Sequence, residues 1–226
     1  MTTLRLVLGD QLNPRHSWFE TVDPDTVYVF MEVRQETDYV LHHAQKIIAI
    51  FAAMRDLAAS LKAAGHRVHY DAIDDPDNLH DIPANLDRHQ AHYQATRLDR
   101  QLADFARRSC EPCIMVDSEH FLTRRDTVSD IFKDRKSWLM EHFYRQMRAR
   151  HDVLIERDGK PVGGRWNFDQ ENRKSWPGDP PEPADARTRH DHSALWQTIV
   201  DSGVNSFGTP QADHFSWPLN RDEALV

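Results

Sequence analysis

Residues 4–12 read LRLVLGDQL, an apolar run that is closed by Gly9 and Asp10. A run this short, ended by turn-forming residues, is typical of a buried strand that leads into a tight turn. The pattern returns at residues 26–31, which read TVYVFM and follow the turn-forming residues 23–25. The start of the chain therefore predicts two buried strands.

The strongest helical pattern in the chain follows the second strand. We expect its N-terminal cap at Thr37 or Asp38 and its end at Gly65. Its apolar stripe is as wide as a helix packed on a sheet requires. The stripe comprises Val40, Ala44, Ile47, Phe51, Met54, Ala58 and Leu61.

The remaining elements complete an alternating order of strands and helices. Further strands are predicted at residues 67–70, 113–116 and 153–155, and further helices at residues 99–109, 137–149 and 194–202. Because strands alternate with helices, we predict the α/β class, with an open, mostly parallel, Rossmann-like sheet and flanking helices.

The texture of the sequence changes at about Asp158, where glycines and prolines become frequent. Such a composition is typical of a long, irregular and partly stiff linker. Near the end, Asn220 and Glu223 form a capping-box pattern that predicts the start of a helix. We therefore expect an α/β domain at residues 1–156, an interdomain linker at 157–213 and the start of a truncated helical domain at 214–226.

The composition argues against several classes of protein. The 226 residues carry a formal net charge of −8, and 39% of them are hydrophobic. No apolar run reaches the roughly 18 residues of a membrane span, and the N-terminus has no signal-peptide pattern. We therefore expect a cytoplasmic protein with no membrane partner. The acidic balance argues against a nucleic-acid-binding surface over the whole chain, because phosphate contacts need concentrated lysine and arginine.

The two cysteines, Cys110 and Cys113, are in the wrong context for a redox or metal site. A thioredoxin-like site needs its first cysteine at a helix N-terminus, whereas this pair ends a predicted helix. A structural zinc needs four ligands. The sequence also lacks a phosphate-binding glycine motif and a credible nucleophile constellation. We predict no metal ligands and no catalytic residues.

Polar residues gather where the first two predicted strands end. Gly9, Asp10 and Gln11 follow the first strand, and Glu36 and Tyr39 follow the second. Because ligands of open parallel sheets bind outside the carboxyl ends of the strands, we expect these residues to meet at one edge of the sheet.

An apolar wall is expected beside these polar residues, from Ile47, Ile50 and Phe51 on the long helix. A polar mouth with apolar and aromatic walls suits a small heteroaromatic ligand. Ordinary turn chemistry explains a Gly-Asp pair at a strand end equally well, and both interpretations stay open at this point.

A further stretch, at residues 162–173, reads VGGRWNFDQENR. It combines adjacent glycines, spaced aromatics and alternating charge without a helical or strand period, which predicts irregular backbone pinned against another surface. Together with residues 8–12, 32–47, 136–145 and 215–225, it resembles the photolyase-related branch of the cryptochrome/photolyase family, the bacterial branch that carries an iron–sulfur cluster. The matching segments span nearly the whole chain.

This resemblance implies that the chain contains an antenna domain. In relatives the antenna cleft holds 6,7-dimethyl-8-ribityllumazine, and by positional match the residues around it would be Asp10, Gln11, Glu36, Tyr39 and Ile50. Carboxylates and amides would bond the ring edge and the ribityl hydroxyls, while Tyr39 and Ile50 would pack on the ring faces. Excitation energy would pass to FAD in a helical flavin domain, in cis or in trans, which repairs damaged DNA or signals light.

The flavin domain is expected to be missing from these 226 residues. An iron–sulfur cluster needs four thiolates, and the chain has two cysteines. FAD, the cluster and contact with DNA are therefore expected only in the missing domain, and the chain alone is not expected to repair DNA. One alternative is a stand-alone ligand-binding or regulatory α/β protein that docks a separate subunit. Another is an unrelated nucleotide-binding enzyme, which lacks the support of a phosphate motif.

Overall fold

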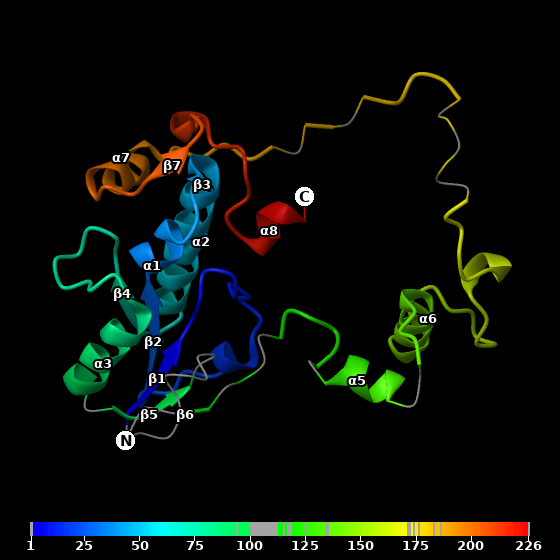
Figure 1. Ribbon diagram of the computed structural model, residues 1–226, viewed down its shortest axis with the longest axis horizontal. Helices are drawn as coiled ribbons and strands as arrows, with labels where there is room; N and C mark the ends of the chain where they lie inside the picture. Colours follow the sequence, from blue (N-terminus) through cyan, green and yellow to red (C-terminus); the bar gives the residue numbers. More distant parts are fainter. Residues whose placement is uncertain are drawn as a thin grey trace. The chain divides into compact units, whose positions relative to one another are not determined.

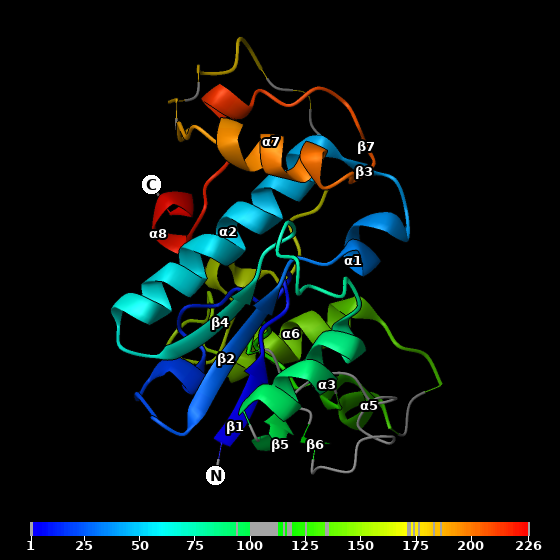
Figure 2. The same cartoon turned by 90° about the vertical axis from the view of Figure 1, so that its left-hand side faces the viewer.

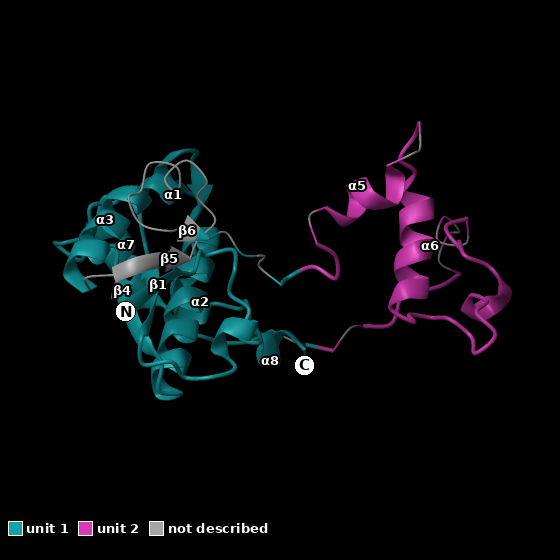
Figure 3. Cartoon of the chain, turned by 90° about the horizontal axis from the view of Figure 1, so that it is seen from below, with its two compact units in different colours: residues 1–120, 185–226 teal, residues 121–184 magenta. Residues whose placement is uncertain are grey.

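The fold is described from a computed structural model (Figure 1). It describes residues 2–93, 95–99, 113–114, 116, 119–124, 126–133, 136–170, 173, 175, 177–182, 184–185 and 187–225. The chain forms two compact units, coloured separately in Figure 3. Unit 1 comprises residues 1–120 and 185–226, and unit 2 comprises residues 121–184. The predicted boundaries at residues 156 and 213 stay a prediction.

Unit 1 is built on a five-stranded sheet with the strand order β4-β2-β1-β5-β6. All of its strand pairs are parallel. The strands are β1 (Thr2–Leu6), β2 (Thr26–Met31), β4 (Arg67–Asp71), β5 (Ala95–Asp99) and β6 (Cys113–Ile114). The predicted α/β class with a mostly parallel sheet and flanking helices is confirmed.

The two faces of the sheet are covered by different helices (Figure 2). Tyr28 and Phe30 of β2 pack in one apolar cluster with α2 (Ala44–Ala63) and α7 (Ser193–Asp201). Val27 and Val29, which alternate with them, pack on the other side with α3 (Ile82–Tyr93). All four side chains are at most 1% exposed. Burial on both faces explains why β2 reads as a continuous apolar run.

The long helix starts later than the sequence predicts, so the expected cap at Thr37 or Asp38 is wrong. A separate short helix, α1 (Arg34–Asp38), comes first, and the extended pair β3 (His42–His43) follows it. The ring Nδ1 of His43 accepts a hydrogen bond of 3.1 Å from the Gln45 amide and caps α2. The break has a tertiary cause, because β3 pairs with the distant strand β7 (Ser206–Phe207).

Several residues between 195 and 215 pack into the core of unit 1. Leu195 and Ile199 of α7 and Phe215 are buried in the cluster that contains α2. Phe215 follows the 3-10 helix η4 (Ala212–His214). The chain then enters α8 (Arg221–Ala224), whose Glu223 amide donates to the Asn220 side chain at 3.1 Å. The predicted cap at Asn220 is confirmed.

Unit 2 contains α5 (Thr127–Phe132), α6 (Met140–Arg150) and the 3-10 helix η2 (Val162–Gly164). Trp166 of the 162–173 stretch contacts α6, where the Arg148 guanidinium lies 5.2 Å from the Trp166 ring centroid. The Asn167 amide donates to Glu141 at 3.4 Å. These contacts attach Trp166 and Asn167 to α6, but Val162 and Phe168 stay exposed, so the prediction that the whole stretch is pinned against another surface stays a prediction.

The remaining predictions of strands and helices have different outcomes. The predicted strand at residues 153–155 is wrong. Only Ile155 makes an isolated β-bridge there, to Pro161. Helix α3 was not predicted. The helix expected at residues 99–109 and Cys110 lie outside the described residues, apart from Asp99, which ends β5. Within the described ranges, no helix has the length and apolar character needed to span a bilayer. The 3-10 helix η1 (Ser17–Phe19) completes the elements of unit 1.

Candidate functional site

A cavity of about 390 Å³ opens at the carboxyl edge of the sheet, between the ends of β1 and β2 and the helices α1, α2 and α3. Its floor is apolar and buried. The buried floor residues are Leu6, Val7, Met31, Val33, Ile47, Phe51, Met54 and Ile82. A cavity of this volume, with apolar walls, is of the size that holds a small organic ligand.

The mouth of the cavity is polar and exposed. Asp10, Glu36, Tyr39 and Lys46 line it, and all four are exposed. Within the described residues, the carboxylates of Asp10 and Glu36 form neither an ion pair nor a hydrogen bond. The Tyr39 side chain is 68% exposed and packs edge-on against the His42 ring. The mouth therefore offers two acceptor groups and an aromatic surface to a ligand that rests on the apolar floor.

Five of the six predicted site residues line this one cavity. They are Gly9, Asp10, Glu36, Tyr39 and Ile50. The sixth, Gln11, does not line it. Its backbone N–H donates to the Leu8 carbonyl at 2.9 Å in the turn after β1. The roles of all six in binding a ligand stay a prediction.

Gly9 allows α2 to pack closely against the end of β1. A Cβ atom at this position would lie 2.8 Å from Cγ2 of Ile50 and 3.1 Å from the sulfur of Met54. The first distance is shorter than real Cβ contacts, so a larger residue would push Ile50 away. The glycine thus sets the distance between two walls of the cavity.

Lys46 and His42 were not among the predicted site residues, although both line the cavity. The Lys46 ammonium lies 3.0 Å from Nδ1 of His42. The sequence held a usable signal for Lys46, since it precedes Ile50 by four residues and side chains at that spacing share a helix face. Nothing in the local sequence places His42 there, because its position depends on the pairing of β3 with β7.

Glu32, one of the polar residues after β2, lies outside the cavity and serves the core. Its buried carboxylate accepts from Arg55 at 2.7 and 2.8 Å, from the Tyr70 hydroxyl at 2.6 Å and from the Ile73 amide at 2.9 Å. Burial, with the Glu32 charge as the second cause, raises the pKa of Tyr70 well above its ordinary value. The tyrosine therefore stays a hydrogen-bond donor to Glu32 at neutral pH.

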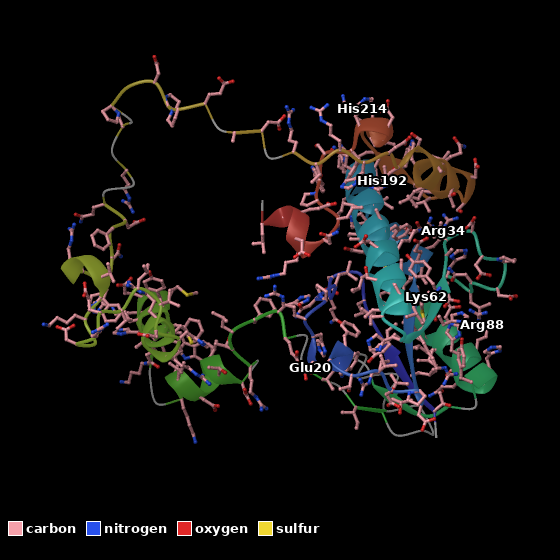
Figure 4. All side chains as sticks on the ribbon, turned by 180° about the vertical axis from the view of Figure 1, so that it is seen from behind. Glu20, Arg34, Lys62, Arg88, His192 and His214 are labelled. Atoms are coloured by element: carbon pink, nitrogen blue, oxygen red, sulfur yellow. The ribbon has the colours of Figure 1, made fainter. Side chains whose placement is uncertain are left out.

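A second cluster surrounds Asp71 at the end of β4. Its carboxylate lies 3.1 Å from Nε2 of His69 and 2.6 Å from Nε2 of His89. The ligand atoms of these three residues lie within 4.8 Å of one another. However, Arg88 also donates to Asp71, at 2.5 Å; Figure 4 labels this arginine. A cation already pairs with the carboxylate, so the cluster is a charged network around a buried carboxylate that joins α3 to β4.

Comparison with known proteins identifies the family. The family model described as deoxyribodipyrimidine photo-lyase-related protein matches residues 5–217. The chain belongs to the photolyase-related family. A (6-4) photolyase of Agrobacterium fabrum (strain C58 / ATCC 33970) is similar to this photolyase-related chain, with 36% identity over an alignment 241 residues long. The alignment covers 99% of this chain and 46% of that relative. The chain thus spans about half the length of the curated relative that it matches.

Proposed function

We propose that unit 1 is the light-harvesting antenna domain of a photolyase-related protein and that its cavity binds a lumazine-type chromophore. The observation that carries this proposal is the apolar-floored cavity at the carboxyl edge of the sheet, which gathers Gly9, Asp10, Glu36, Tyr39 and Ile50. A fused heteroaromatic ring with a polyhydroxyl chain suits such a site, because the floor takes the ring and the mouth takes the hydroxyls.

The chain's own residues have distinct parts in binding. The carboxylates of Asp10 and Glu36 accept hydrogen bonds from ribityl hydroxyls or ring N–H groups, since an ionised carboxylate has acceptors only. Tyr39 and Ile50 pack on the ring, and the buried floor excludes water from its inner edge. When bound, the chromophore absorbs near-ultraviolet or blue light and passes the excitation energy on.

The repair chemistry belongs, in this proposal, to a helical flavin domain that acts in cis or in trans. The relative that carries the name (6-4) photolyase is about twice as long as the part that aligns with this chain. An iron–sulfur cluster needs four thiolates, and this chain has two cysteines, so the cluster does not fit this chain alone. We assign FAD, the cluster and contact with damaged DNA to that domain.

Reconstitution with 6,7-dimethyl-8-ribityllumazine tests the proposal. The purified chain is titrated with the lumazine and followed by ligand fluorescence and near-ultraviolet absorption, and we expect one molecule bound per chain. Glu36→Ala is expected to weaken binding about tenfold, because a hydrogen bond to a charged group contributes about 1.5 kcal/mol or more. The matched control is Glu20→Ala, since Glu20 is also an exposed glutamate of unit 1 but does not line the cavity (Figure 4).

Two results would contradict the proposal. If the folded chain binds neither lumazine nor flavin, the cavity is not an antenna site, and a docking or regulatory protein becomes the better interpretation. If Glu20→Ala weakens binding as much as Glu36→Ala, the ligand is held by general surface charge and not by the cavity mouth.

A further inference from the structure

Lys46 occupies a distinct position in the cavity wall. It lies in the first turn of α2, and Ile50 and Met54 follow it at intervals of four residues. Residues at this spacing lie above one another on one helix face, and all three line the cavity. This face of α2 therefore lines the cavity with a cation at the mouth and two apolar side chains below it.

The contact with His42 holds the Lys46 ammonium at this mouth. The two nitrogens are 3.0 Å apart. An ammonium has only hydrogen-bond donors, so Nδ1 of His42 is the acceptor in this contact. His42 is in turn fixed, because it is 9% exposed and its backbone pairs with Ser206 in β7.

The charges at the mouth are separated and not neutralised by one another. Asp10 and Glu36 line the same cavity, yet within the described residues Lys46 forms no ion pair with either carboxylate. A mouth with an unpaired cation on α2 and unpaired anions on the turn after β1 and on α1 is electrostatically divided. A ligand that fits it brings donors to one side and an acceptor to the other.

We propose that Lys46 is the specificity-determining residue of this cavity and that it binds the carbonyl edge of a pyrimidinedione ring. This inference rests on the proposed function, since it names which edge of the lumazine faces the cation. A pyrimidinedione carries carbonyl oxygens on one side, while the ribityl hydroxyls lie at the other end of the molecule. The Lys46 ammonium donates to a carbonyl, and the carboxylates of Asp10 and Glu36 accept from the hydroxyls.

Matched lysine variants of the whole chain test this assignment. Lys46→Met keeps the length of the side chain and removes its charge, and Lys46→Arg keeps the charge. The control is Lys62→Met, because Lys62 lies in the last turn of the same helix and does not line the cavity (Figure 4). Binding of 6,7-dimethyl-8-ribityllumazine is measured by fluorescence titration, and the absorption spectrum of the bound ligand is recorded for each variant.

We expect Lys46→Met to weaken lumazine binding about tenfold or more, the usual effect of losing a hydrogen bond to a charged group. The absorption maximum of the bound ligand should also shift, because a cation no longer polarises the carbonyl. Lys46→Arg should recover most of the affinity, and Lys62→Met should match the unmodified chain. Thermal unfolding of the ligand-free variants checks that each one folds.

The outcomes separate the two proposals. If the unmodified chain binds lumazine while Lys46→Met binds it equally tightly with an unchanged spectrum, the role of Lys46 is refuted and the antenna proposal stands. If Lys46→Arg is as weak as Lys46→Met, charge is not the determinant and the assignment also fails. If the unmodified chain does not bind lumazine, the antenna proposal itself fails and the assignment fails with it.

Discussion

Truncation of Ile199 to alanine tests whether α7 is part of the core of unit 1. The side chain is 0% exposed and packs in the apolar cluster that contains α2. Fully burying an isoleucine side chain contributes about 1.5–3 kcal/mol, and the unfilled cavity adds to the cost, so that buried Ile→Ala changes cost about 2–5 kcal/mol. We expect Ile199→Ala to lower the free energy of unfolding by about 3 kcal/mol.

Urea denaturation followed by far-ultraviolet circular dichroism measures this loss, with the free energy extrapolated linearly to water. The control is Val200→Ala on the same helix, since Val200 is 45% exposed. A surface truncation of this kind changes stability by no more than about 0.5 kcal/mol. If Ile199→Ala costs less than about 1 kcal/mol, well below the range for buried isoleucines, α7 does not stabilise unit 1 and behaves as a detachable linker.

Two further predictions concern the end of β4 and the β3–β7 pair. Burial raises the pKa of Asp71, but hydrogen bonds from His69 and His89 outweigh it and leave the pKa below its ordinary value. Asp71 thus contributes stability above its unfolded pKa of about 4, and this contribution is lost as the pH falls through that value towards the lower folded pKa. The free energy of unfolding should therefore decline less steeply between about pH 5 and pH 2 in Asp71→Asn than in the unmodified chain. Equal slopes of the free energy of unfolding against pH in the two proteins would contradict this prediction. Gly208 has a φ of +80°, and a Cβ atom there would lie 2.2 Å from Nε2 of His43. Gly208→Ala should therefore displace β3 and weaken lumazine binding several-fold, while the five-stranded sheet stays intact. An unchanged dissociation constant for lumazine would show that β3 does not shape the cavity mouth.

Strands β1, β2 and β4 and the body of the long helix could be predicted because their causes are local, whereas β5 was not predicted. Residues 26–31 form β2 with the predicted bounds, since an apolar run between turn formers has few other ways to bury itself. The helical stripe from Ala44 to Leu61 is buried as predicted. The glycine after the helix was also informative, because Gly65 has the positive φ of +94° that a helix end favours.

The predictions that failed depend on partners far away in the sequence. Val40 fits the helical stripe by spacing, but it is 49% exposed and precedes the helix. Its neighbours at residues 42–43 are held extended by residues 206–207, a pairing that no local pattern encodes. Glu32 also follows a strand directly, but its carboxylate forms an ion pair with Arg55 on α2, a partner that lies 23 residues away.

The same long-range pairing explains how the candidate site is built. The sheet edge supplies the turn at Gly9 and Asp10, but the part of the wall that contains His42 depends on β7, which pairs with β3. Arg34 on α1 reinforces this wall, as its guanidinium donates to the Ser202 carbonyl at the end of α7. A pattern confined to residues 4–65 can therefore predict where the cavity lies, because parallel strands fix that edge. The shape of the mouth requires residues 193–208 as well, so mutations in that segment should change the cavity although none of these residues lines it.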